Sequence, residues 1–281
     1  MTMRCLIIAQ YLLWVSIAAA QIAPECAGIE KPADYDEDKQ RAFMQNFSMA
    51  TFLPLPIIDA HPSDALTSSI GIDATLVPTL SCQERLALNA TKTEDANKSP
   101  IFPRPRFNTN VISKRQFSLT AGISFLPPMP IPHFSLWYLG AESSFLYEPL
   151  VGVVVGARGF MGLGYLRAEI ATPFDKNDPV KDDWFSFGIM GFDVLSSFGI
   201  PLSEGQKLYL FLSFGFVKGA SLFVVGDDGV TVANDRYPLF SLTNFVGLSY
   251  HVFARRLNLS LCIGGALNTM MTGHLRLAYM F

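Results

Sequence analysis

Charge is scarce in this chain. Only 16% of its 281 residues are charged, whereas a soluble globular protein carries about 25%. The 21 basic and 24 acidic residues give a formal net charge of −3. No basic surface is therefore expected to follow a phosphate backbone, which excludes nucleic acid as a partner. A hydrophobic share of 50% and a mean hydropathy of +0.30 exclude a disordered chain.

The sequence also lacks the short motifs that mark common catalytic and metal centres. It contains no C-x-x-C pair, no H-E-x-x-H, no P-loop glycine motif and no nucleophile elbow. Gly159, Gly162 and Gly164 lie inside a strand pattern, and we interpret them as close packing or barrel curvature rather than a phosphate cradle. The sequence predicts no cofactor, no metal site and no catalytic residue.

Residues 1–20 have the features of a secretory signal peptide. Arg4 supplies the positive start, an apolar run follows, and Ala18 to Ala20 are the small residues of a cleavage site before Gln21. The alternative is a single membrane anchor, but the run is shorter than the ~20 apolar residues that a spanning helix needs. We therefore predict export and cleavage after Ala20.

Three cysteines remain after that cleavage. Cys26 and Cys82 lie in the polar N-terminal part, where a bridge between them would close a long loop and stabilise the fold by ~4 kcal/mol. An odd number requires at least one unpaired thiol. Cys26 and Cys82 are the disulfide candidate, although the sequence leaves open whether they pair. Cys262 lies in an apolar strand pattern and is predicted to be a buried free thiol.

Residues 21–64 are predicted to form a periplasmic or plug-like N-terminal segment. Its acidic run, Asp34 to Asp38, resembles a calcium loop but lacks the glycine and the distal glutamate of an EF-hand, so a solvated segment is the better interpretation. Pro54 and Pro56 interrupt the apolar residues 44–58.

Residues 65–281 alternate between apolar and polar positions with a period of two, which indicates β-strands. The alternation occurs in about ten segments: 70–76, 117–125, 137–147, 151–157, 166–170, 184–193, 208–216, 240–252, 257–263 and 275–281. Between them, Lys92 to Arg106 is predicted to be a long loop. It starts with a polar run and ends in Pro103-Arg104-Pro105-Arg106, which we expect to be incompatible with a central strand.

Two architectures produce such alternation. In a soluble, lipocalin-like carrier the apolar face lines an internal pocket, whereas in a membrane barrel it faces lipid. The polar positions here are rich in Gly, Ser and Thr but poor in Lys and Glu, which favours the membrane. Aromatic residues near strand ends, such as Trp137, Tyr138, Trp184, Tyr209 and Tyr250, suit interfacial girdles. We predict an all-β, transmembrane antiparallel β-barrel over residues 65–281.

The last residues carry a resemblance to a known family. Leu275, Leu277, Tyr279 and Phe281 occupy every second position up to the final residue. This pattern resembles the closing strand of bacterial outer-membrane β-barrel proteins. The resemblance implies a Gram-negative outer membrane, contact with its lipids and bilayer, and an assembly signal at Tyr279 and Phe281 that is read by the barrel-assembly machinery. It also implies an even strand number, for which we predict ten, with eight or twelve as alternatives.

An outward apolar face places the polar positions in the lumen. The predicted lumen-lining residues are Asp73, Glu142, Arg158, Arg167, Glu169, His251, His274 and Arg276. In a narrow lumen these charges would pair and plug it, whereas a wider lumen would pass small solutes. We predict a non-catalytic barrel that passes or binds small solutes or has a structural role in the envelope.

A lipid-modifying enzyme is the catalytic alternative. A serine hydroxyl needs an adjacent base to act as a nucleophile. Ser249 and His251 share a face two residues apart, with Asn244 nearby as a polar residue to orient the histidine. A chance pairing of Ser and His on one strand is the simpler interpretation.

Overall fold

The computed structural model describes the barrel and a few residues outside it. The described residues are 53–54, 68–76, 92–94, 101–114, 116–128, 134–168, 171–173, 182–224, 231–233, 239–252, 256–267 and 271–281. The predictions for the signal peptide, for residues 21–64 apart from 53–54, and for Cys26, Cys82 and Glu169 lie outside these residues.

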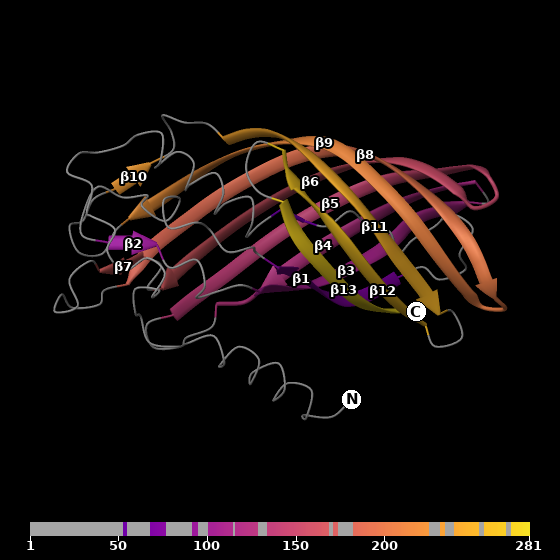
Figure 1. Cartoon of the computed structure of the whole chain (residues 1–281), viewed down its shortest axis with the longest axis horizontal. Coiled ribbons are helices and arrows are strands. Elements are labelled where there is room, and N and C mark those ends of the chain that lie inside the picture. Colours follow the sequence, from indigo (N-terminus) through magenta and orange to yellow (C-terminus); the bar gives the residue numbers. More distant parts are fainter. Residues whose placement is uncertain are drawn as a thin grey trace, which may run out of the picture.

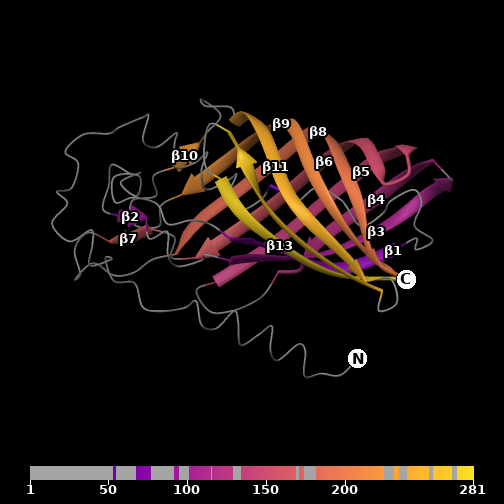
Figure 2. The ribbon, with the colours of Figure 1, turned by 45° about the vertical axis from the view of Figure 1, so that its right-hand side comes forward.

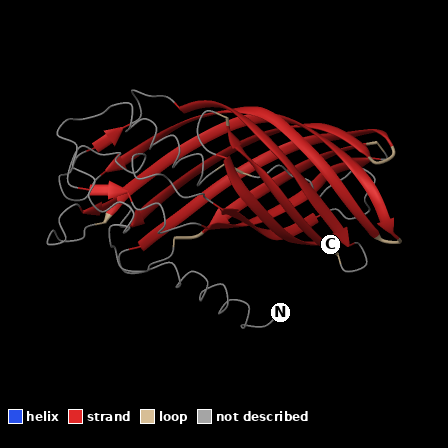
Figure 3. Cartoon of the chain, viewed as in Figure 1, coloured by secondary structure: helices blue, strands red, loops and turns tan. Residues whose placement is uncertain are grey.

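The described secondary structure consists of strands (Figure 3). Within these residues no helix is long and apolar enough to cross a membrane. The strands are β1 (Ser68–Leu76), β2 (Lys92–Glu94), β3 (Ile101–Lys114), β4 (Phe117–Leu126), β5 (Phe134–Leu150), β6 (Val153–Ala168), β7 (Ala171–Pro173), β8 (Asp183–Ser203), β9 (Gln206–Val224), β10 (Thr231–Ala233), β11 (Leu239–Val252), β12 (Leu257–Ala266) and β13 (Met271–Met280).

Ten of these strands form a closed antiparallel barrel (Figures 1 and 2). Their order is β9-β11-β12-β13-β1-β3-β4-β5-β6-β8, and β8 pairs with β9 to complete the circle. The short strand β10 adds to β9, while β2 and β7 pair with each other. The predicted fold class and strand number are confirmed.

The seam between the first and last strands closes through the backbone. Ser69 of β1 lies opposite Met280 of β13, and the register continues to Leu76 opposite Gly273. Beyond it, Ser68 N donates to Phe281 O at 3.0 Å and Phe281 N donates to Ser68 O at 2.8 Å. Closure leaves no sheet edge, which a structure surrounded by lipid requires.

The two ends of the barrel differ in the length of their connections. At one end, residues 115–116, 151–152, 204–205 and 253–256 link successive strands. At the other, residues 77–100, 169–182 and 225–238 are long connections, and residues 127–133 and 267–270 are shorter ones. Gly152 and Gly205 have φ values of +81° and +74°, which suit tight turns. β1 begins and β13 ends at the short-turn end, and Figure 1 shows β2, β7 and β10 at the opposite end.

Apolar side chains cover the outside of the wall. Along β1, Ile70 and Ile72 are 54% and 51% exposed, whereas Asp73, the next residue on the opposite face, is 2% exposed. The same alternation continues around the barrel, where large apolar residues are exposed and Ser, Thr, Arg, Asp and His are buried. The apolar face therefore points outward, which is opposite to the lipocalin-like alternative, and that alternative is wrong.

Residues 101–106 belong to a strand, which corrects the loop predicted there. β3 includes Pro103 and Pro105, and it pairs with β1 from Ile101. Its pairing with β4 starts only at Arg106. Residues two apart in a strand direct their N–H groups to the same side. Residues 101–105 pair with β1 on one side and with no strand on the other. A proline there has no N–H to donate on the unpaired side, and no hydrogen bond of the sheet is lost.

Two segments predicted as separate strands, 151–157 and 166–170, contribute to one strand, β6. The division arose because apolar residues occupy both faces of β6: Leu163 is 50% exposed and Leu166 only 4%. Joining two predicted strands and adding the missed β3 leaves the count at ten. The strand number was thus right through two errors that cancel.

Candidate functional site in the barrel lumen

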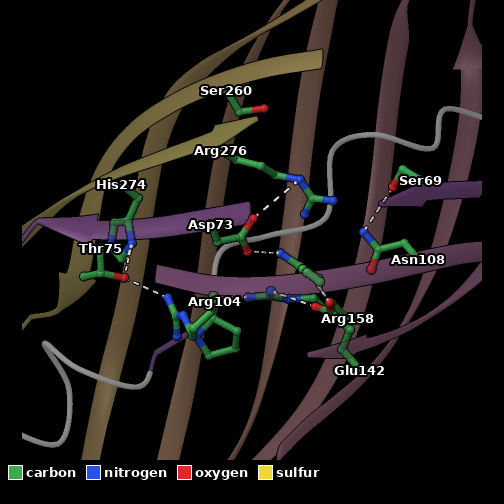
Figure 4. Close-up of polar contacts among 12 residues, drawn as sticks. Ser69, Asp73, Thr75, Arg104, Asn108, Glu142, Arg158, Ser260, His274 and Arg276 are labelled. Atoms are coloured by element: carbon green, nitrogen blue, oxygen red, sulfur yellow. Dashed lines mark hydrogen bonds and ion pairs between the residues drawn. The ribbon is translucent and has the colours of Figure 1, made fainter. Parts of the chain in front are cut away.

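A chain of paired charges follows the inner wall of the barrel, and Figure 4 shows part of it. It begins at Arg276 on β13, whose Nε lies 3.5 Å from Asp73 Oδ1 on β1. Asp73 Oδ2 in turn accepts a hydrogen bond from Arg106 Nη1 on β3 at 2.8 Å. Asp73 thus joins two arginines from the strands on either side of it.

The chain continues through two more carboxylates. Arg106 pairs with Glu142 Oε1 on β5, and Glu142 Oε2 lies 3.3 Å from Arg158 Nη1 on β6. Arg158 Nε donates to both carboxylate oxygens of Asp193 on β8, at 3.2 and 3.0 Å. Three arginines and three carboxylates therefore alternate from β13 round to β8, with every guanidinium between 0 and 1% exposed.

The chain passes over β4 at a glycine. Gly122 lies opposite Asn108 of β3 and opposite Glu142 of β5. A Cβ at this position would lie 2.7 Å from Glu142 Oε1 and 2.8 Å from its Cγ. The missing side chain leaves space for Arg106 of β3 and Glu142 of β5 to meet, although β4 lies between these two strands.

Arg158 also binds a residue from outside the barrel strands. Its Nη2 donates to the backbone oxygen of Pro54 at 3.2 Å, and Leu53 is 1% exposed. The guanidinium carbon lies 4.8 Å from the ring centroid of Phe160, a cation–π distance. Residues 53–54 therefore lie against an inward-facing side chain of β6.

Aromatic side chains fill part of the lumen beside these charges. Tyr138, Phe185 and Phe187 are between 0 and 5% exposed, and the Phe187 ring lies 6.2 and 6.0 Å from the rings of Tyr138 and Phe185. Tyr138 and Tyr209 were expected in interfacial girdles, and that expectation is wrong because both are buried. Trp184, at 48% exposure, does face outward.

A second polar cluster lines β11 and β12. Ser249 Oγ lies 3.0 Å from His251 Nε2 and 2.8 Å from Ser260 Oγ. Asn258 Nδ2 lies 2.7 Å from the same His251 nitrogen, and the Tyr209 ring meets the imidazole edge-on at 4.7 Å. Ser249, His251 and Asn258 are all 0% exposed. The residue beside this pair is Asn258, not Asn244, which lies an odd number of positions from Ser249 on β11 and so on its other face.

The structure places six of the predicted lumen residues on the buried face. Asp73, Glu142, Arg158 and Arg276 join the charged chain; His251 lies in the β11–β12 cluster, and His274 contacts Thr75 at 3.2 Å and Thr272 at 2.6 Å. Cys262 is 3% exposed and free, which confirms the prediction of a buried thiol. Tyr279 and Phe281 lie on the outer face, at 45% and 47% exposure.

The prediction that Arg167 lines the lumen together with Arg158 is wrong. The two are nine positions apart on β6, an odd number, so their side chains face opposite ways. The Arg167 side chain is 50% exposed, pairs with Asp182 at 3.2 Å and lies 5.9 Å from the Trp184 ring centroid.

Three charged members of the site were missed by sequence reasoning: Arg104, Arg106 and Asp193. The signal for the first two was present, because Arg104, Arg106 and Asn108 occupy every second position; the intervening prolines concealed it. Among the described residues no group of three His, Cys, Asp or Glu side chains is placed to hold a metal ion.

The closed sheet, the apolar outer wall and the polar lumen define the class of this protein as a membrane-spanning β-barrel of the outer-membrane type. No known family profile matches the chain, and no curated protein matches it.

Solved barrels resemble the chain only distantly. LpxR from Salmonella typhimurium is 8% identical, with 76% of this chain and 100% of that chain covered and a TM-score of 0.34. A deletion mutant of the TodX monoaromatic hydrocarbon channel is 12% identical, with 83% and 73% covered and a TM-score of 0.34. A mutant porin of Rhodopseudomonas blastica is 8% identical, with 77% and 99% covered and a TM-score of 0.21. Such values carry no argument about the activity of this chain.

Proposed function

We propose that this protein is a non-catalytic β-barrel of a Gram-negative outer membrane whose lumen is closed by the charged chain. The short connections at one end and long connections at the other match outer-membrane barrels, which have short periplasmic turns. Under this proposal the start of β1 and the end of β13 lie on the periplasmic side. The proposed partners are the lipid bilayer and, during assembly, the barrel-assembly machinery.

The observation that carries the proposal is the burial of the alternating charges. Arg106 and Arg158 side chains are 0% exposed, and each pairs with two carboxylates. A selective pore instead presents its charges to a water-filled path. Paired charges here join β13, β1, β3, β5, β6 and β8, so the chain supports a closed barrel with a structural or solute-binding role. Passage of a small solute would require the chain to open.

We also propose that residues 21–64 act as a plug. The support is the contact of Pro54 O with Arg158, together with the burial of Leu53. Because Arg158 is at the same time a member of the charged chain, it would link the plug to the lumen wall.

Conductance in planar bilayers tests both proposals. The wild-type protein should be silent, whereas the double variant Arg158→Ala/Asp193→Ala, or deletion of residues 21–64, should produce channel events. Arg167→Ala is the matched control, because it removes an outward-facing arginine of the same strand, and it should stay silent. A large steady conductance of the wild type would refute the closed lumen.

The membrane location has a separate test in cell fractionation and gel migration. Recovery as a soluble periplasmic monomer, without heat-modifiable migration in gels, would refute the membrane assignment.

One observation favours a second candidate, a lipid-modifying enzyme. The 3.0 Å contact of Ser249 Oγ with His251 Nε2 is within the reach of a nucleophile and its base. Both residues are 0% exposed, so a substrate would need an opening of the β11–β12 wall. The test is the lipid composition of membranes that contain the wild type or His251→Ala. A composition that the variant leaves unchanged removes this candidate.

A further inference from the structure

Arg104 on β3 is a buried guanidinium that forms no ion pair with another residue of the described strands. The residue is 4% exposed, and its hydrogen bond within the described structure runs from Nη2 to Thr75 Oγ1, at 2.7 Å. Its Nε and Nη1 atoms are buried and have no hydrogen-bond partner among the residues that the structure describes. Arginine cannot lose its proton at accessible pH, so the charge remains.

The carboxylate opposite Arg104 in the sheet is already paired with other arginines. Asp73 lies directly opposite Arg104 in the register of β1 and β3. Its carboxylate nevertheless contacts Arg106 and Arg276, and Arg104 turns towards Thr75 instead (Figure 4). In the described part of this cluster four arginines, Arg104, Arg106, Arg158 and Arg276, accompany three carboxylates, Asp73, Glu142 and Asp193. One positive charge is left over.

The guanidinium keeps one complete edge for a ligand. Nη2 shares one edge of the group with Nε and the other with Nη1, and it carries one N–H on each. Thr75 occupies one of these two N–H groups, so the remaining edge offers two parallel donors. Two parallel N–H donors match the two oxygens of a carboxylate.

We propose that the Arg104 edge binds a small monovalent anion inside the barrel, and that a carboxylate is its best-fitting ligand. Formate, acetate and the halides are the smallest such anions, and the burial of Nε and Nη1 favours ligands of that size. Thr75 holds the arginine in place, and His274 in turn contacts Thr75 at 3.2 Å. The site neutralises the surplus charge of the cluster, and it exists whether or not the lumen conducts.

Calorimetric titration of the full-length protein in detergent micelles with sodium formate tests the proposal. The wild type should bind formate, and Arg104→Met should weaken binding at least tenfold. Arg167→Met removes an arginine from the outer face and should leave the affinity within twofold. In crystals soaked in sodium bromide, an anomalous peak should lie within hydrogen-bond distance of Arg104 Nε or Nη1.

Arg104→Lys keeps the test decisive if the methionine variant fails to fold. Lysine retains the charge but has no two-donor edge, so formate should bind more weakly while bromide remains. Equal formate affinity in the wild type and in either Arg104 variant would overturn the site. So would a wild-type protein that binds neither formate nor bromide at Arg104.

Discussion

Arg106 and Glu142 form an ion pair across the intervening strand β4, at the one position where that strand presents Gly122 between them. The pair therefore depends on a residue that contributes no side chain. Because it is one step in a chain from Arg276 to Asp193, a change at Gly122 should affect the whole lumen.

We expect Gly122→Ala to destabilise the barrel by about 1–3 kcal/mol, because a new methyl group in a filled space forces its neighbours to move. Urea unfolding followed by the heat-modifiable gel shift measures the effect. Gly159→Ala is the matched control, since a Cβ there meets no atom within 4 Å. Equal stabilities of the two variants would show that Gly122 is not needed for the crossing.

Arg158→Met should cost about 3–5 kcal/mol of stability, because removal of one partner leaves a buried charge without compensation. Its Nε and Nη2 are the contacts of Asp193 in the chain. The double variant Arg158→Met/Asp193→Leu should recover part of this loss, since no lone carboxylate then remains. The same urea titration compares the three proteins. A double variant less stable than Arg158→Met would contradict the pairing.

The outer wall can be probed with one charge at two depths. Val194 is 50% exposed on β8 beside the level of the charged chain, and Val151 is 99% exposed in a short turn. Val194→Arg should destabilise the barrel by about 2–4 kcal/mol, as expected for arginine near the bilayer midplane, whereas Val151→Arg should change little. Folding into lipid vesicles at graded urea concentrations measures both. A harmless Val194→Arg would argue against lipid at that face.

The seam between β1 and β13 allows a test of whether barrel closure depends on backbone hydrogen bonds or on the Phe281 side chain. Deletion of Phe281 removes the two backbone hydrogen bonds with Ser68, whereas Phe281→Leu keeps them. If closure depends on the backbone, the deletion should lower the yield of membrane-inserted, heat-modifiable barrel and Phe281→Leu should retain most of it. Loss of assembly in both variants would indicate instead that the aromatic side chain is read as a signal.

Much of the fold was accessible from the sequence. The period of two in segments such as 70–76 and 117–125 predicted strands that the structure contains, because a half-buried strand must alternate its side chains. The low charge and the polar positions rich in Gly, Ser and Thr indicated an apolar face in lipid. From these features follow the all-β class, the closed barrel and the pairing of the first and last strands.

Two predictions from the sequence, the loop at residues 101–106 and the inward position of Arg167, were wrong for local reasons. Pro103 and Pro105 argue against a central strand in general, and only the stagger of β4 against β3 shows that one side of that stretch is unpaired. On β6 the apolar residues occupy both faces, so the sequence could not place Arg158 and Arg167 on opposite sides of the wall. For β3 the deciding information lay in the neighbouring strand β4, and for β6 it lay in the continuity of one strand from Val153 to Ala168.

By itself, then, the sequence determined the class of architecture and which residue types face lipid, because hydrophobic alternation is a property of each strand alone. The tertiary structure decided which charges meet. The contacts of Asp73 with Arg106 and Arg276, and the isolation of Arg104 opposite it, depend on register between strands and on the space at Gly122. Register is a relation between segments distant in the chain, and a one-residue shift would reverse every face.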